Sequence, residues 1–213
     1  MTGEFEIRPG DVLLVVDVQN DFCPGGGLAV AEGDRVVPLI NRLAGRFDHV
    51  VLTQDWHPAG HLSFASSHPD AGPYDTIAMP YGDQTLWPDH CIQGTSGAAF
   101  HPDLDTTKAT LTIRKGFRRE IDSYSAFREN DGKTLTGLAG YLRERAVSRV
   151  VICGLALDFC VRWTAEDAVA AGFAAVVVGD GCRPVALPGT VEAANASFRE
   201  NSIPVVAAAA IPG

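Results

Sequence analysis

Four residues with catalytic potential each follow an apolar run of the chain. Asp17 ends the run VLLVVD, Asp55 ends VVLTQD and Lys115 ends LTIRK, while Cys160 follows VVICG at a turn into the next expected helix. Apolar, β-branched runs are typical of buried strands, and the carboxyl ends of parallel strands meet at one edge of a sheet. We therefore expect a thiol, two carboxylates and an amine to meet at that edge.

A cysteine placed in this way can act as a nucleophile. Cys160 is expected in the first turn of a helix that begins near Asp158, where unpaired backbone N–H groups favour the thiolate. Lys115 would lower the pKa of the thiol further, and Asp17 could accept the thiol proton and later pass it to a leaving group. The pattern predicts cysteine-based nucleophilic catalysis. Cys153, inside VVICG, is expected to be a buried structural residue.

Metal-ligating side chains gather downstream of the second strand. Asp55 and His57 form an Asp-x-His motif, and further histidines follow at 61, 68, 90 and 101. One carboxylate with two imidazoles suits zinc, iron(II) or manganese and leaves positions open for water or substrate. The motif predicts a divalent metal site, but the spacing alone does not choose its third ligand.

The elements that must position these residues alternate along the chain. Strands are expected at 12–16, 50–53, 111–113, 150–153 and 175–178, and helices at 34–44, 134–145, 158–171 and 190–200, several of them opened by a capping Asp or Thr. This alternation predicts a three-layer α/β/α fold with a mostly parallel central sheet. The segment of about 55–101 follows neither pattern. Since it holds two tryptophans and five of the six histidines, we expect a functional loop within a single domain of residues 1–213.

Composition narrows the function classes. With 213 residues, 46% of them hydrophobic, the chain can bury a sizeable core. A net charge of −9 without a Lys/Arg cluster disfavours nucleic acid as a partner, and no apolar run approaches the roughly 20 residues of a membrane span. The five cysteines are an odd number without a CxxC pair, and residues 1–10 lack a secretory pattern. These features predict a cytoplasmic protein.

Five motifs together resemble a known family. In chain order they are DVQNDFCPGGGLAV, TQDWHPAGHLSF, LWPDHCIQGTSGAAFHPDL, KGFRREIDSYSAF and GLALDFCVRWTAEDAVAAG, and the resemblance runs from about residue 11 to residue 183. They resemble the nicotinamidases of the isochorismatase-like cysteine hydrolase superfamily. The resemblance implies the isochorismatase-like hydrolase fold and hydrolysis of nicotinamide to nicotinate and ammonia through a thioester, in NAD salvage. Related enzymes of this type also accept pyrazinamide.

The matching motifs also imply roles for individual residues. They give a catalytic triad of Asp17, Lys115 and Cys160, and a set of ligands for one divalent ion (Zn, Fe or Mn) formed by Asp55, His57 and His90. His61 falls where some relatives have a fourth ligand, and Ser63 lies close to it in the same loop, so the resemblance leaves that position open. His68 and His101 are assigned to structure.

The resemblance further implies how the substrate is held. Phe22 and Trp87, with Tyr124 as a third candidate, match positions that pack against a pyridine ring. The backbone N–H groups of Ala156 and Cys160 match an oxyanion hole, with a cis peptide expected between Ala156 and the next residue. Compared with the usual family pattern, Leu157 and Phe159 remove two hydroxyl groups near the site, which could shift substrate preference.

Three alternatives compete with this interpretation. A ureido- or carbamoyl-amide amidase of the same superfamily would use the triad but lack the metal set, which the Asp-x-His motif disfavours. An iron(II) oxygenase would use two histidines and a carboxylate but leave Lys115 and Cys160 without a role. A non-catalytic thiol or metal-binding protein would release no ammonia from an amide. The sequence leaves the oligomeric state open, with a homo-oligomer as one possibility.

Overall fold

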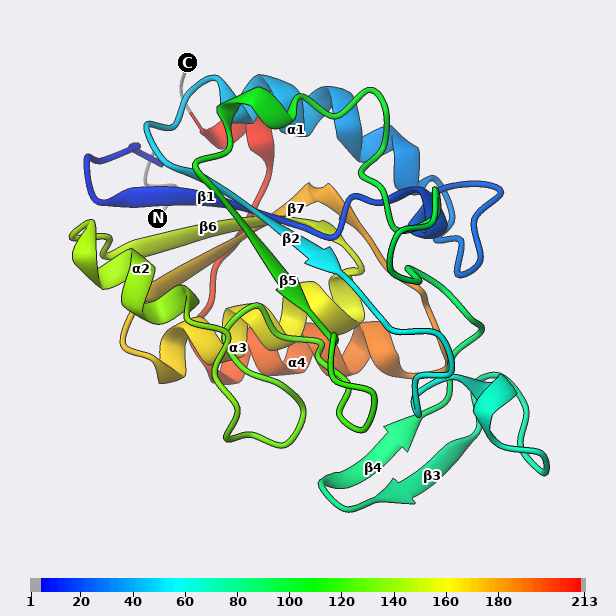
Figure 1. The fold of residues 1–213 in the computed structure, drawn as a ribbon. Helices are drawn as coiled ribbons and strands as arrows, with labels where there is room; N and C mark the ends of the chain where they lie inside the picture. Colours follow the sequence, from blue (N-terminus) through cyan, green and yellow to red (C-terminus); the bar gives the residue numbers. More distant parts are fainter. Residues whose placement is uncertain (1–4, 212–213) are drawn as a thin grey trace.

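The computed structural model describes residues 5–211 and is built on a six-stranded sheet (Figure 1). The strand order is β5-β2-β1-β6-β7-β8, and every neighbouring pair is parallel. The predicted mostly parallel sheet is confirmed, and each predicted strand lies within an observed one. The strands are β1 (Asp11–Val16), β2 (Val50–Asp55), β5 (Leu111–Lys115), β6 (Arg149–Leu155), β7 (Ala174–Arg183) and β8 (Val205–Val206).

The middle of the sheet is the hydrophobic core of the molecule. All residues of β1 and β2 are buried, and Leu14 in β1 pairs with Val51 on one side and Ile152 on the other. Strands that are covered on both faces read as continuous apolar runs rather than as alternating ones, which is why these segments could be recognised in the sequence.

Helices cover both faces of this sheet, as the three-layer prediction requires. Helix α1 (Val37–Ala44) lies on one face, and α3 (Arg162–Ala170) and α4 (Thr190–Glu200) lie on the other (Figure 1). Helix α2 (Leu138–Glu144) is attached near α3, because Arg143 donates a hydrogen bond to the carbonyl of Ala171. All four predicted helices are present, and α4 has the predicted bounds.

The predicted caps, in contrast, are wrong. The residues before α1, α2, α3 and α4 are Val36, Gly137, Val161 and Gly189, and none of them provides a side-chain cap. Helix α3 starts later than expected because a π-helical turn, Leu157–Val161, comes first. Asp158, expected as a cap, instead accepts hydrogen bonds from the backbone of Val185 and Ala186 and from the Thr190 hydroxyl. The carboxylate therefore joins this turn to the chain that leads into α4.

The segment of about 55–101 is mostly irregular, but it contains a hairpin that the sequence did not reveal. The hairpin consists of β3 (Thr76–Met79) and β4 (Gly82–Thr85), paired antiparallel, and it projects from the body of the molecule (Figure 1). Strands of four residues that are largely exposed carry too short a pattern to be recognised. Gln84 alone in the hairpin is fully buried, which anchors it to the rest of the structure.

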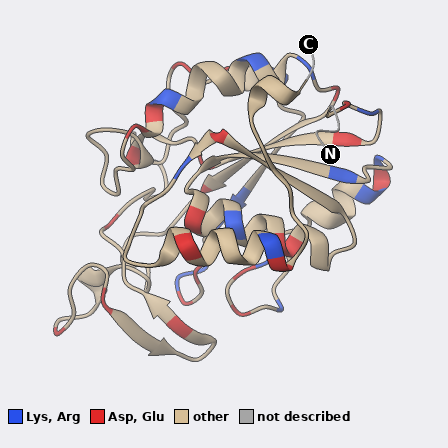
Figure 2. Cartoon of the chain, turned by 180° about the vertical axis from the view of Figure 1, so that it is seen from behind, with Lys and Arg blue, Asp and Glu red and all other residues tan. Residues whose placement is uncertain are grey.

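Charged side chains of both signs are interspersed over the helices and loops (Figure 2). Within residues 5–211, no helix is long and apolar enough to cross a membrane. Residues 1–4 and 212–213, which belong to the predicted domain of 1–213, lie outside the described residues. The extent of the domain thus stays a prediction, as does the absence of a signal segment.

Candidate active site

Lys115, the last residue of β5, is fully buried among three potentially reactive side chains. Its Nζ lies 2.8 Å from Asp17 Oδ2, 2.6 Å from Asp55 Oδ1 and 3.4 Å from Cys160 Sγ. The topology explains this meeting, because β5, β2, β1 and β6 are neighbours and their carboxyl ends point to one edge of the sheet. The structure therefore brings together the four side chains that the sequence placed at strand ends.

The lysine and the two carboxylates form one charge network. Burial opposes a charge on Lys115, but Asp17 and Asp55 raise its pKa well above the ordinary value. Burial likewise opposes a charge on Asp55, but Lys115 and His57 bring its pKa well below the ordinary value. At Asp17 burial outweighs the effect of Lys115, and the pKa is raised. Asp17 is therefore the carboxylate of this pair that takes up a proton more readily.

Asp17 also has an acceptor atom available. Its Oδ1 accepts a hydrogen bond from Thr53 Oγ1 at 2.5 Å. Its Oδ2 forms an ion pair with Lys115 Nζ at 2.8 Å, and a carboxylate oxygen of Asp17 lies within 4.8 Å of Cys160 Sγ. The lysine ammonium also donates hydrogen bonds to Asp55, Ser123 and Cys160. A buried carboxylate oxygen in this state is suited to accept a proton from a neighbouring thiol.

Cys160 lies in the π-helical turn between β6 and α3. Turns of this kind are frequent at functional sites. Burial raises the pKa of the Cys160 thiol well above its ordinary value, with Lys115 opposing this effect and Asp17 adding to it. The prediction of a favoured thiolate is therefore wrong, because a strand-to-helix pattern does not reveal burial beside two carboxylates. The thiol needs a base, and Asp17 is placed to be that base.

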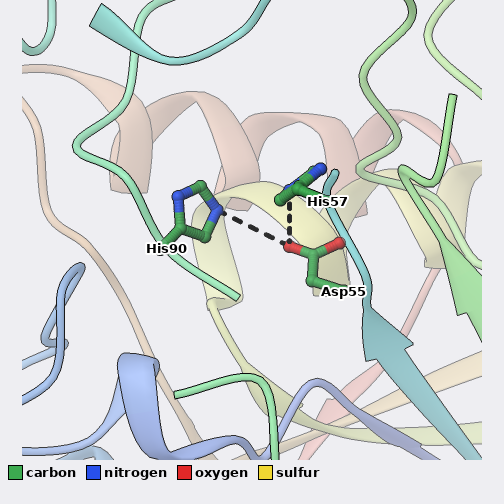
Figure 3. Close-up of side chains that lie close together, drawn as sticks. All are labelled: Asp55, His57 and His90. Atoms are coloured by element: carbon green, nitrogen blue, oxygen red, sulfur yellow. Dashed lines mark ion pairs between the residues drawn. The ribbon is translucent and has the colours of Figure 1, made fainter. Parts of the chain in front are cut away.

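Asp55, His57 and His90 form a compact group next to this network (Figure 3). The Nε2 atoms of His57 and His90 lie 3.6 and 3.8 Å from Asp55 Oδ2, and all three side chains are buried. Their candidate ligand atoms lie within 4.8 Å of one another. One carboxylate oxygen and two imidazole nitrogens that face a common point are a donor set for a transition-metal ion.

The surroundings of both histidines fit this role. His57 Nδ1 lies 2.8 Å from the carbonyl oxygen of Gly116, and His90 Nδ1 lies 2.8 Å from that of Pro88. A carbonyl can only accept, so each Nδ1 donates its proton to a carbonyl, and the Nε2 atoms are the ring nitrogens that face Asp55 and could ligate an ion. Metal-binding histidines are commonly oriented in this way. Gly116 has φ +65°, and a Cβ there would lie 2.4 Å from His57 Cε1, so the absence of a side chain makes room for the ring.

The position that the sequence left open is occupied by other contacts. His61 Nδ1 lies 2.7 Å from Ser63 Oγ, and His61 Nε2 lies 2.8 Å from the carbonyl oxygen of Arg118. Its ring instead packs against that of His57, with ring centroids 4.5 Å apart. Neither His61 nor Ser63 belongs to the metal-ligating group found within residues 5–211. His61 thus supports His57 from behind.

A cavity opens onto both the thiol and the metal-ligating group. Its wall includes Asp55, His90 and Cys160 together with the expected aromatic residues Phe22, Trp87 and Tyr124. Trp87 Nε1 donates a hydrogen bond to the Tyr124 hydroxyl at 3.1 Å. A narrow space between aromatic rings suits a small, flat ring.

Several wall residues were not assigned to the site from the sequence. They are Leu28, Asp122 and Val185, and they are joined by Phe159, which the sequence placed near the site without a role in the wall. Phe159 packs edge-on against Trp87, with ring centroids 4.8 Å apart, so it completes the aromatic wall. The position of Phe159 directly before Cys160 could have indicated this role. The spacing of the other three residues gives no indication that they line the cavity.

The backbone near Cys160 departs from the prediction in one detail. The cis peptide bond joins Leu155 to Ala156, one residue before the predicted bond between Ala156 and Leu157. The chain makes the change as it leaves β6, whose last residue is Leu155. Ala156 and Cys160, whose N–H groups are predicted to form an oxyanion hole, both line the cavity.

This arrangement can carry out acyl transfer. The thiol of Cys160 lies within 4.8 Å of a carboxylate oxygen of Asp17, a buried ammonium lies next to both, and aromatic residues line the cavity in front of the thiol. His90 and Asp55 line the same cavity, so a metal ion held there would touch a bound ring.

Known proteins of one family resemble this chain over most of its length. The model of the isochorismatase domain matches residues 11–209. A nicotinamidase of Acinetobacter baylyi is 57% identical over 180 residues, which cover 84% of this chain and 84% of the relative.

Solved structures resemble the computed fold as well. The nicotinamidase/pyrazinamidase of Acinetobacter baumanii is 52% identical, with a TM-score of 0.94 over 95% of this chain and 98% of that one. A pyrazinamidase of Pyrococcus horikoshii in complex with zinc is 36% identical, with a TM-score of 0.77 over 93% of this chain and 99% of that one.

Proposed function

The chain belongs to the isochorismatase family and has nicotinamidase activity, and we propose that Cys160, Asp17 and Lys115 carry out the hydrolysis. The observation that carries this assignment is the shared cavity, in which the Cys160 thiol faces the same space as the aromatic wall. The substrate is nicotinamide, and the similarity to a nicotinamidase/pyrazinamidase extends the activity to pyrazinamide. The products are the ring carboxylate and ammonia.

In the first half of the reaction the amide is cleaved. Asp17 takes the proton of the Cys160 thiol, and the sulfur attacks the carboxamide carbon, so that an S–C bond forms and the carbonyl oxygen becomes negative. The N–H groups of Ala156 and Cys160 stabilise this oxygen, a contribution of about 3 kcal/mol for each donor. Asp17 then returns its proton to the amide nitrogen, the C–N bond breaks, and ammonia leaves a thioester on Cys160.

In the second half water releases the product. Asp17 takes a proton from a water molecule as the water oxygen attacks the thioester carbon. The S–C bond breaks, Asp17 passes its proton to the sulfur, and the carboxylic acid that leaves gives its remaining proton to solvent and becomes the carboxylate. Lys115 remains a cation throughout, because its pKa is well above the ordinary value, and it limits the charge that accumulates between Asp17 and Cys160.

Asp55, His57 and His90 would hold one divalent metal ion, for which zinc, iron and manganese are all suitable. The support is the buried donor set, the carbonyl-bound Nδ1 atoms and the zinc complex of a related pyrazinamidase. When bound, the ion would ligate the ring nitrogen and so orient the substrate. Phe22 and Trp87 would sandwich the ring and bring its carboxamide toward Cys160.

We assign the enzyme to the cytoplasm and its reaction to NAD salvage. The support for the compartment is that all five cysteines are unpaired, at positions covered by residues 5–211. Among the rival functions, an oxygenase would give no role to Lys115, which bonds to Asp55 and Cys160. An amidase without metal would give no role to the paired histidines.

Replacing the nucleophile tests the assignment. We expect Cys160→Ala to abolish ammonia release from nicotinamide while circular dichroism and bound metal stay as in the parent protein. Cys153→Ala is the matched control, because Cys153 is also buried but belongs to β6 away from the cavity. Substantial activity in the Cys160 variant, or equal loss in both, would refute the assignment.

A further inference from the structure

Gln19 is a fully buried polar residue that bonds to the backbone of Asp55 through its side chain. Its Oε1 accepts a hydrogen bond from the Asp55 N–H at 2.8 Å, and its Nε2 donates to the Asp55 carbonyl at 2.9 Å. The same Nε2 donates to the carbonyl of Ala98, also at 2.9 Å. The side-chain amide thus pairs with one residue as the backbone of a neighbouring strand would.

The sheet topology explains why Asp55 needs this partner. On one side Asp55 pairs with Lys115 of β5, and there the Trp56 N–H bonds to the Lys115 carbonyl. On the other side lies β1, which ends at Val16. Asp55 therefore extends beyond its neighbouring strand, and a buried N–H and C=O without partners would be costly. Gln19 supplies both partners.

The position of Asp55 decides two functions at once. Its Oδ1 bonds to Lys115 Nζ, and its Oδ2 faces the Nε2 atoms of His57 and His90. Any shift of the Asp55 backbone would therefore move both carboxylate oxygens, the one that bonds to Lys115 and the one that faces the two histidines. The main-chain N–H of Gln19 also donates to the main-chain carbonyl of Asp17 at 2.8 Å, so Gln19 is held next to the residue that carries the other carboxylate.

We infer that Gln19 is a positioning residue that sets the location of Asp55 relative to Asp17. Its side-chain hydrogen bonds go to main-chain groups of Asp55 and Ala98, so it acts through the backbone on both the lysine network and the metal group. The activity part of this inference rests on the proposed function, whereas the metal-binding part does not.

The test replaces the amide by an apolar group of similar length. In Gln19→Met the size is retained and all three hydrogen bonds to Asp55 and Ala98 are lost. We expect the Kd for Zn²⁺, measured on the full chain by competition with a chromophoric chelator, to rise about 10- to 100-fold. At saturating Zn²⁺ we expect kcat for nicotinamide to fall by up to about 100-fold, because Lys115 also loses its alignment.

Gln54→Met is the matched control. Gln54 is also buried and its Nε2 donates to the same Ala98 carbonyl at 2.9 Å, but its side-chain hydrogen bonds go to Ala98 and Arg114. We expect this variant to keep the parent Kd for Zn²⁺ and the parent kcat. If Gln19→Met does not fold, Gln19→Glu takes its place, since it retains the size and the acceptor for the Asp55 N–H.

If Gln19 only stabilised the fold as a whole, the Gln19→Met variant would behave differently. In that case Gln19→Met would melt at a lower temperature while its folded fraction kept the parent Zn²⁺ affinity and kcat, and the inference would be overturned. Equal effects in the Gln54 variant would overturn it too. If the parent chain binds Zn²⁺ but hydrolyses no amide, the proposed function fails and the Zn²⁺ comparison still decides the role of Gln19. If it hydrolyses nicotinamide without binding Zn²⁺, the comparison of kcat between the parent and the two variants decides the role of Gln19.

Discussion

Removal of the buried ammonium at Lys115 should damage both the stability and the activity of this enzyme. In Lys115→Met the chain keeps an unbranched side chain of similar length but leaves Asp17 and Asp55 without the cation that lies 2.8 and 2.6 Å from them. At an effective dielectric constant of about 20, each attraction at such a distance is worth about 6 kcal/mol before desolvation. Desolvation of the three buried ions offsets much of this gain.

The net effect can be given from the behaviour of buried ion pairs. Removing one partner of such a pair destabilises a protein by about 3–5 kcal/mol, since the remaining charge is buried without compensation. For a chain of this size we expect a decrease in Tm of about 6–20 °C. Ammonia release should be lost, because neither the thiol nor Asp17 retains its cationic neighbour.

The pH dependence gives a sharper test. The pKa of Asp55 in the parent lies well below its ordinary value, so its stabilising contribution is present at neutral pH and is lost as the pH falls through that lowered pKa. Without Lys115, burial dominates at Asp17 and Asp55 and raises both pKa values above those of the unfolded chain. The variant is then destabilised at neutral pH and recovers as the pH falls through the raised values. The difference in stability between the two proteins should therefore shrink on acidification.

Urea denaturation at pH 7 and pH 5 measures this difference, with a chelator present so that metal binding does not contribute. Lys108→Met is the control, because Lys108 is exposed, and it should stay within about 0.5 kcal/mol of the parent. The reasoning would be refuted if Lys115→Met matched the parent in stability at pH 7. A difference that grew on acidification would refute the electrostatic explanation.

Two further predictions concern the metal group and the substrate. Gly116→Ala should weaken Zn²⁺ binding about 10- to 100-fold, because the new Cβ displaces His57, whereas Gly132→Ala, which has a similar φ of +69° but no atom within 4 Å of the new Cβ, should bind as the parent does. Equal Zn²⁺ affinities in the two variants would contradict this. Benzamide, which has a carbon in place of the ring nitrogen, should lose several kcal/mol in kcat/KM relative to nicotinamide, while pyrazinamide is turned over. Ammonia release from the three amides, with and without added divalent metal, checks this, and equal rates for benzamide and nicotinamide would show that the ring nitrogen is not recognised.

The sequence alone was sufficient for the architecture and for the meeting of the reactive residues. Apolar β-branched runs identify buried strands, and alternation with helices implies parallel pairing. Once the strands are parallel, residues at their carboxyl ends must share an edge. For this reason Asp17, Asp55, Lys115 and Cys160 could be grouped although up to 143 positions separate them along the chain, as the numbering of Asp17 and Cys160 shows.

The tertiary structure decided what depends on neighbours that are distant in sequence. The pKa of Cys160 is raised because burial outweighs Lys115, and neither effect is visible in a strand-to-helix motif. His61 is engaged by Ser63 and by a carbonyl 57 positions away, so it lies outside the metal group. Asp158 bonds to a distant segment instead of capping a helix.

Throughout this protein, local sequence patterns predict the secondary structure, whereas contacts formed on folding determine the chemistry of the site. Periodicity and composition report how a segment divides its surface between core and solvent, and this is a local property of the chain. Ionisation, ligand choice and the pairing of Gln19 with Asp55 depend on which polar groups compete for each atom after folding. Such competition is set by contacts between segments, and only the folded chain brings those segments together.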